Sequence, residues 1–202
     1  MPCGQRAPRL RGVRGHSGLR REDVVQLDGG LRVVRTDVTW GDLADRLTVD
    51  DLVVLGDAML RRGLSTLDAL NRIASGTRHR RGVRLLRLAV PLLEPRTDSP
   101  METRVRLLLV RAGLPCPQAN RDVVVDGEWI ARPDLSYPHL RIAIEYDGDH
   151  HRSRRQWRSD RARRQLLEDA GWVVLELTAD DVLRRPEATV ERVRRVVCAR
   201  AR

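Results

Sequence analysis

The chain has 202 residues and a formal net charge of +10, and its 38 basic residues other than histidine are all arginine. That length suffices for one elaborated domain or for a domain with a smaller one, and the absence of phenylalanine requires an aliphatic core. Three scattered cysteines without a C-x-x-C pair exclude a disulfide framework and a zinc knuckle. Residues 1–21 lack the apolar stretch of a signal peptide, and no segment approaches the roughly 18 apolar residues of a membrane span, so we expect a cytoplasmic protein. The arginine excess favours a polyanionic partner, although a generally basic surface would give the same charge.

The first half of the chain is predicted to be mostly helical. Residues 1–22 are rich in arginine and glycine without periodicity, and we expect a mobile basic arm there. A short strand is predicted over residues 31–37. Apolar side chains at helical spacing then predict helices within residues 39–63, 65–76 and 80–93, the last bent or ended by a proline. Residues 23–95 are therefore expected to form a helical region, in which we identify no cluster of chemically active side chains.

Proline, serine and aspartate interrupt the helical pattern at residues 94–100, where a second domain over residues 96–202 is predicted to begin. Ser99 can cap a helix that starts at Pro100, with Glu102 in the reciprocal position of a capping box. Downstream, Asp126-Gly127 between two strand-like runs predicts a hairpin. Further segments complete a mixed α/β layout: strands near residues 140–148 and 172–178, and helices near residues 155–170 and 186–197.

Acidic residues occupy positions on the predicted strands where a buried strand would carry apolar ones. Alternation along residues 140–148 places Glu145 and Asp147 on one face and apolar side chains on the other. Asp134 ends a preceding strand that would carry Ile130 and Arg132 on the same face, and a turn near residues 138–140 would place it opposite Glu145. Like charges at such separations repel, so a positive group should lie among them. Oxygen ligands of this kind suit Mg²⁺ or Mn²⁺ and a substrate phosphate.

Pro133-Asp134 followed by Glu145 eleven positions later resembles the PD-(D/E)xK nuclease superfamily. The longer runs at residues 132–151 and 159–177 resemble a domain-of-unknown-function group of that superfamily, which is related to the very-short-patch mismatch repair endonuclease. The resemblance covers about residues 97–198. It implies a restriction-endonuclease-like mixed sheet flanked by helices, with DNA as the expected partner and RNA as a second option.

The resemblance also implies roles for individual residues. Asp134 and Glu145 match the metal-binding acids. Glu102 matches a helical glutamate that would assist through the metal or through a water molecule, and its capping role is the structural alternative. Asp147 stands where the motif has lysine, which this chain lacks, so it would orient the site or simply begin a turn. His150 or His151 would act as the general base.

An arginine-dense run follows the predicted site. Arginines at helical spacing there could bind flanking phosphates, although a solvated helical face is the ordinary alternative. The candidates are Arg152, Arg154, Arg155 and Arg158.

Two functional hypotheses follow. The first is an endonuclease that hydrolyses DNA phosphodiester bonds with Mg²⁺ or Mn²⁺. The second is a catalytically inactive protein with the nuclease fold that binds nucleic acid or acts as an antitoxin-like regulator, and the missing lysine favours it somewhat. A domain that binds RNA nonspecifically through arginine is a third possibility.

Overall fold

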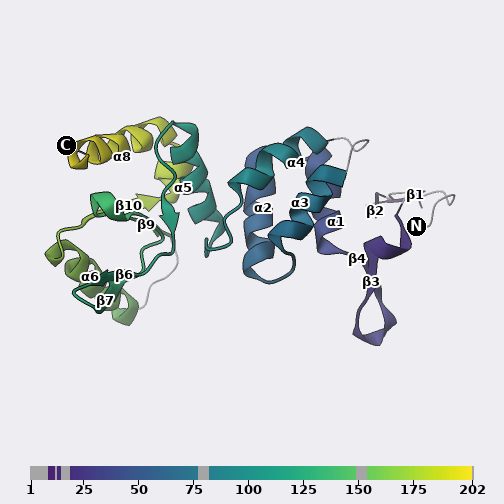
Figure 1. The fold of residues 1–202 in the computed structure, drawn as a ribbon, viewed down its shortest axis with the longest axis horizontal. Helices are drawn as coiled ribbons and strands as arrows, with labels where there is room; N and C mark the ends of the chain where they lie inside the picture. Colours follow the sequence, from purple (N-terminus) through teal and green to yellow (C-terminus); the bar gives the residue numbers. More distant parts are fainter. Residues whose placement is uncertain (1–8, 12, 15–18, 77–81, 149–153, 202) are drawn as a thin grey trace.

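The computed structural model describes residues 9–11, 13–14, 19–76, 82–148 and 154–201, and the side chains of residues 154–160 lie outside this description (Figure 1). Part of the predicted basic arm also lies outside it, and the described remainder includes two short strands. The elements of the first half are β1 (Arg9–Leu10), β2 (Val13–Arg14), β3 (Val24–Gln26), β4 (Arg32–Val34), α1 (Thr36–Asp42), α2 (Val49–Arg61), α3 (Leu67–Gly76) and α4 (Val83–Ala89).

Helices α1 to α4 enclose an apolar core of their own. Trp40, Leu52, Leu70 and Leu86 are fully buried in it, and the Trp40 indole N–H donates to the Leu52 carbonyl at 2.9 Å. Helix α4 ends at Ala89, just before Pro91, because proline cannot continue the backbone hydrogen-bond ladder. The prediction of a mostly helical region is confirmed. The strand predicted over residues 31–37 ends at Val34, however, because α1 begins at Thr36.

The second half builds a mixed sheet between helices (Figure 1). Among the described residues the strand order of this sheet is β10-β9-β8-β5, with β8 antiparallel and β10 parallel to β9. The elements are α5 (Pro100–Arg111), β5 (Gln118–Ala119), β6 (Val123–Val125), β7 (Glu128–Ala131), β8 (Leu135–Tyr137), β9 (Ile142–Asp147), α6 (Arg154–Asp169), β10 (Val173–Thr178), α7 (Ala179–Leu183) and α8 (Pro186–Arg200). This is the restriction-endonuclease-like α/β layout predicted from the sequence.

The two faces of β9 enter different cores, as the alternation of its side chains predicts. Ile142 and Ile144 are buried against α5, α7 and α8. Ala143, on the other face, packs with Leu167 of α6 and with Trp172. Because the apolar residues fill one face completely, the acids of β9 are confined to the face that α6 covers.

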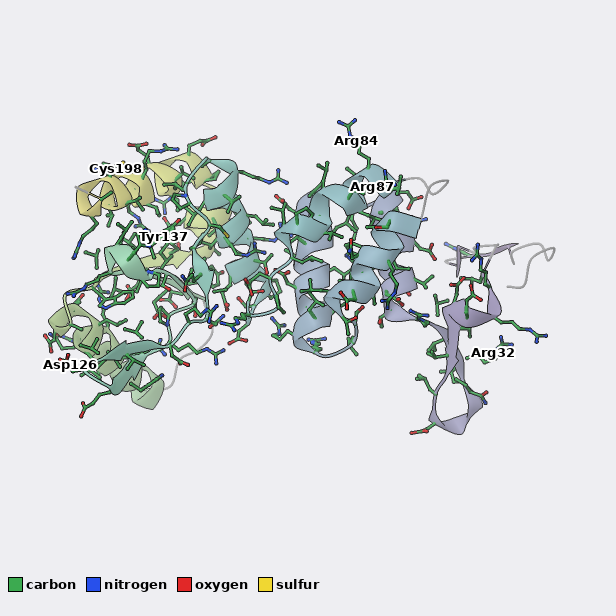
Figure 2. All side chains as sticks on the ribbon, in the orientation of Figure 1. Arg32, Arg84, Arg87, Asp126, Tyr137 and Cys198 are labelled. Carbon is green, nitrogen blue, oxygen red and sulfur yellow. The ribbon has the colours of Figure 1, made fainter. Side chains whose placement is uncertain are left out.

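The chain around Asp134 differs from the prediction in one respect and agrees in another. The hairpin β6–β7 forms as predicted, with positive φ angles of 52° and 84° at Asp126 (labelled in Figure 2) and Gly127, but it pairs outside the main sheet. The strand expected to run from Ile130 to Asp134 is broken after Ala131, where Pro133 offers no N–H to a ladder. Pairing resumes in β8 with Leu135 opposite Ile144, so Asp134 lies opposite Glu145 in the predicted register.

The segment predicted to separate the two halves is attached to both. Asp57 of α2 is buried, and its carboxylate accepts from the Glu94 backbone N–H at 2.7 Å, the Thr103 hydroxyl at 2.9 Å and the Arg106 guanidinium at 3.0 Å. Leu107 of α5 packs into the helical core, whereas Val105 and Leu109 of the same helix pack into the core of the sheet. Helix α5 therefore joins the two cores. Among the described residues, no helix is long and apolar enough to cross a membrane.

Candidate active site

Asp134 is held at the entrance of β8 by the backbone on either side of it. Its Oδ2 accepts a hydrogen bond from the Tyr146 N–H at 2.7 Å, and its carbonyl accepts from the Asn120 N–H at 2.9 Å. The side chain is only partly exposed. The hydrogen bond from the Tyr146 N–H therefore holds this carboxylate beside β9, where the charge of Glu145 acts on it.

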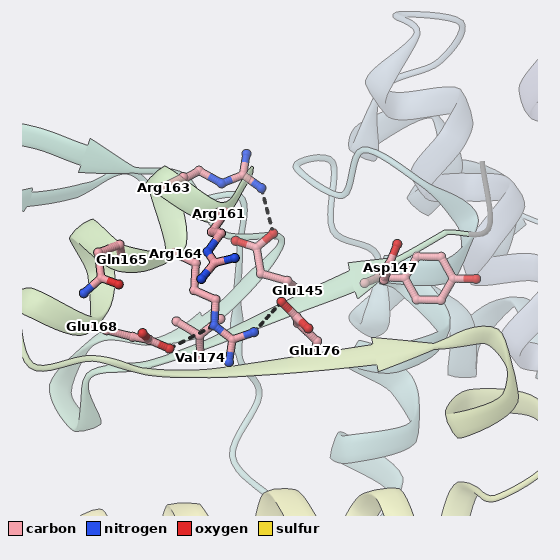
Figure 3. A pocket seen from close by; sticks show the side chains of 10 residues that line it. Glu145, Asp147, Arg161, Arg163, Arg164, Gln165, Glu168, Val174 and Glu176 are labelled. Atoms are coloured by element: carbon pink, nitrogen blue, oxygen red, sulfur yellow. Dashed lines mark hydrogen bonds and ion pairs between the residues drawn. The ribbon is translucent and has the colours of Figure 1, made fainter. Parts of the chain in front are cut away.

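Glu145 faces helix α6 and forms an ion pair there. Its Oε2 lies 3.2 Å from Nη2 of Arg163, and the Glu145 and Arg163 side chains are 17% and 38% exposed (Figure 3).

Burial raises the pKa of Asp134 to about 7. The charges of Glu145 and Glu102 also raise this pKa, while the hydrogen bond from the Tyr146 N–H and the charge of Arg163 lower it. The expectation that a positive group lies beside the acids is confirmed, and in this structure the group is a guanidinium.

Glu102 approaches the pair from the start of α5. It is buried, and its Oε2 accepts from the Asp98 N–H and from Nδ2 of Asn120, both at 2.7 Å. Ser99 caps the helix as predicted, with its Oγ 3.2 Å from the Glu102 N–H. The predicted capping box lacks its reciprocal hydrogen bond. The Glu102 carboxylate accepts from the backbone N–H of Asp98 instead of that of Ser99, and it also accepts from the side chain of Asn120.

Asn120 was not among the residues singled out from the sequence. It joins Glu102 and Asp134, because its side chain bonds the first and its backbone N–H bonds the second. Its φ of 46° is one that asparagine tolerates better than most residues. The available sequence signal was an asparagine directly after a short strand, which is typical of a turn and does not by itself indicate a site.

A cavity of about 520 Å³ lies between β9, β10 and α6, and Glu145 is one of the residues that line it (Figure 3). Asp147 lines it, as do Arg161, Arg163 and Arg164. Glu176 of β10 also lines it and is the parallel partner of Glu145, so β9 and β10 together present Glu145, Asp147 and Glu176 to the cavity. Glu176 was missed although it interrupts an apolar strand, which is the same signal that identified Glu145.

Several predicted residues fall outside the description. His150, His151 and Arg152 lie outside the described residues, and so do the side chains of the three candidates on α6. Those three are Arg154, Arg155 and Arg158. The cationic side chains that the structure does place beside the acids come from the next turns of α6.

The donor set around Asp134 and Glu145 fits a hard divalent cation. Within the part of the chain that the structure describes, no group of three or more histidine, cysteine, aspartate or glutamate side chains is arranged to hold an ion. Mg²⁺, however, is commonly bound by only one or two carboxylates and completes its shell with water and substrate phosphate. Two carboxylates on one face, with oxygen as the donor atom throughout, meet that requirement.

Comparisons with known proteins support a nuclease-like domain in the second half of the chain. Residues 110–197 match the family model REase_MTES_1575, a restriction-endonuclease-like family. The chain is 29% identical over 140 residues to Uncharacterized protein MT2308 and to Uncharacterized protein Rv2248, from Mycobacterium tuberculosis strains CDC 1551 / Oshkosh and ATCC 25618 / H37Rv. Each match covers 69% of this chain and 52% of the relative, so the chain spans about half the length of these relatives.

No solved structure matches the chain significantly. The family match includes Asp134, Glu145 and Arg163 but begins after Glu102. The comparisons therefore support a nuclease-like domain in the part of the chain that carries the acid pair.

Proposed function

We propose that this chain is a divalent-cation-dependent endonuclease that hydrolyses DNA phosphodiester bonds, with an endonuclease-like domain over residues 96–202. The observation that carries the proposal is the placement of Asp134 and Glu145 opposite one another on one face of the β8–β9 pair. The match to a restriction-endonuclease-like family supports nuclease chemistry, and the net charge of +10 supports a polyanionic substrate. Together they agree with the resemblance to PD-(D/E)xK nucleases.

A bound Mg²⁺ or Mn²⁺ would polarise the phosphoryl group and lower the pKa of a water molecule. Asp134 and Glu145 would hold the ion. The Tyr146 N–H orients the first carboxylate by donating to its Oδ2, and the charge of Glu145 is close enough to act on it. Asn120 holds Glu102 close enough for its charge to act on Asp134.

The remaining predicted residues complete the proposal. Asp147 would orient groups at the end of β9, where it lines the cavity. His150 or His151 would take the proton of the attacking water, because a histidine titrates near neutral pH. The arginines that begin the α6 segment would bind the phosphates on either side of the cut.

Two observations favour the alternative of an inactive nucleic-acid-binding or antitoxin-like protein. The chain contains no lysine, and Arg163 is ion-paired with the Glu145 carboxylate. An inactive site could keep such a pair permanently. Calorimetric titration with Mn²⁺ separates the two functions, since only the nuclease requires a cation at these carboxylates.

The direct test is cleavage by the purified protein with Mg²⁺ or Mn²⁺. Single-stranded, duplex and mismatched DNA, and RNA of the same sequence, are compared with and without EDTA. We expect metal-dependent cleavage of DNA that is lost in Asp134→Ala and retained in Asp169→Asn, an exposed acid of α6 bonded to Gln165. No cleavage by the wild type, or equal cleavage by Asp134→Ala, would refute the proposal.

A further inference from the structure

We propose that Arg163 couples substrate to cation: a phosphate that binds in the adjoining cavity draws the Arg163 guanidinium away from Glu145 and so makes that carboxylate available to the divalent ion. This inference rests on the proposed function, because it assumes that Glu145 is a cation ligand. It concerns the order and the coupling of the two binding events, which the acids alone do not determine.

The first step is competition for one carboxylate. The Glu145 side chain is 17% exposed and already carries a guanidinium at 3.2 Å from Oε2. A divalent ion on this carboxylate meets a positive charge directly beside it. Ion and guanidinium therefore stabilise the same negative charge, and each weakens the binding of the other.

The second step is the contrast between two successive arginines of α6. Glu145 and Glu176 are neighbours in the parallel register of β9 and β10, and each is paired with one of these arginines (Figure 3). Arg164 is held between two carboxylates, at 2.6 Å from Glu176 and 2.9 Å from Glu168. A ligand bound at Glu145 would therefore act on Arg163 first. Because Arg164 also lines the cavity, the control is Arg184, which does not line it and pairs with Asp180 at 3.5 Å.

The third step is the cavity, of about 520 Å³, which Arg161, Arg163 and Arg164 line. A guanidinium can bind phosphate through two parallel N–H donors at about 2.7 to 2.9 Å, whereas Nη2 of Arg163 lies 3.2 Å from Oε2 of Glu145. A phosphate in the cavity can thus exchange with Glu145 as the partner of Arg163. By linkage, anion binding must then raise cation affinity and cation binding must raise anion affinity by the same factor.

The test is a calorimetric titration with Mn²⁺ in sodium chloride and, at equal ionic strength, in sodium sulfate, whose tetrahedral anion stands in for phosphate. In chloride we expect Arg163→Ala to bind Mn²⁺ about two- to fivefold more tightly than the wild type, the effect of removing one partly exposed ion pair. Arg163→Lys should stay close to the wild type, and so should Arg184→Ala, which removes an exposed arginine outside the cavity. Sulfate should tighten Mn²⁺ binding to the wild type and to Arg184→Ala, and should have no such effect on Arg163→Ala.

The results distinguish failure of the coupling from failure of the proposed nuclease activity. Arg163→Ala that binds Mn²⁺ no more tightly than the wild type, or that keeps the sulfate effect, would overturn the coupling while the nuclease proposal stands. If the Mn²⁺ binding pattern is as expected but the protein cleaves no nucleic acid, only the nuclease proposal is refuted. If neither the wild type nor Arg163→Ala binds Mn²⁺, the coupling and the nuclease proposal are both refuted. Thermal unfolding checks that each variant is folded, and Arg163→Gln, which keeps most of the side chain without its charge, replaces Arg163→Ala if the latter does not fold.

Discussion

Replacing Asp134 by asparagine should remove activity and stabilise the fold at the same time. The ionised carboxylate is disfavoured in the folded chain, because burial and the charge of Glu145 raise its pKa from 3.8 to about 7. Between these values the folded state holds the proton more tightly than the unfolded state, so this group makes stability fall as pH rises through the interval. Above pH 7 the wild type carries the whole penalty, whereas below about pH 4 it carries none.

The size of the gain in unfolding free energy follows from the difference between the two pKa values, 3.8 and about 7. Across roughly three pH units, at about 1.4 kcal/mol for each, the upper bound is ~4 kcal/mol. Relaxation and water penetration around the carboxylate reduce this figure, so we expect Asp134→Asn to gain ~2 kcal/mol at pH 8. For a chain of this size that gain corresponds to a rise in Tm of about 4 to 8 °C. The asparagine oxygen can still accept from the Tyr146 N–H, so the local fold is retained.

Thermal unfolding of both proteins from pH 4 to pH 8 measures this difference. The advantage of Asp134→Asn should grow with pH and vanish near pH 4, and Asp169→Asn should differ from the wild type by a small amount at every pH. Added Mg²⁺ should raise the Tm of the wild type at pH 8 and leave that of Asp134→Asn unchanged, since an ion bound only to the folded state stabilises it. An asparagine variant no more stable than the wild type at pH 8 would refute the crowding of charge at this site.

Three further substitutions test the surroundings of the acid pair. Glu145→Gln should lower cleavage at least 100-fold in a gel assay with the fold intact by circular dichroism, and near wild-type cleavage would remove it from the site. Asn120→Gly, which tolerates the positive φ, should release the Glu102 carboxylate, costing about 1 to 2 kcal/mol in urea unfolding and lowering the rate of cleavage; an unchanged rate would make this contact purely structural. Asp57→Ala should lower the free energy of unfolding in urea by about 3 to 5 kcal/mol, because it leaves the buried Arg106 guanidinium without its ion pair. Asp51→Ala breaks the more exposed pair with Arg104 and should cost no more than about 1 kcal/mol. Equal losses in the two variants would contradict the buried network.

Much of the fold could be predicted from local chemistry. The cap at Ser99, the Asp126-Gly127 turn and the helical stop near Gly63 depend on a few adjacent residues, and each lies where the sequence places it. Side-chain alternation placed Glu145 on the face opposite Ile144, because the period of a strand is independent of its neighbours. The pairing of Asp134 with Glu145 also followed, since a tight turn leaves little freedom of register.

What the sequence by itself determined is therefore the position of the main helices, of β9 and of β10, and the two faces of β9, whereas β5, the break before β8 and α7 differ from the predicted order. Only the tertiary structure decided which groups meet the acid pair: Asn120 from the end of β5, Glu176 from a parallel neighbour and Arg163 from the helix across the face. The physical reason is that contacts between segments distant in the chain depend on how strands are ordered and helices are packed, and local periodicity carries no information about either.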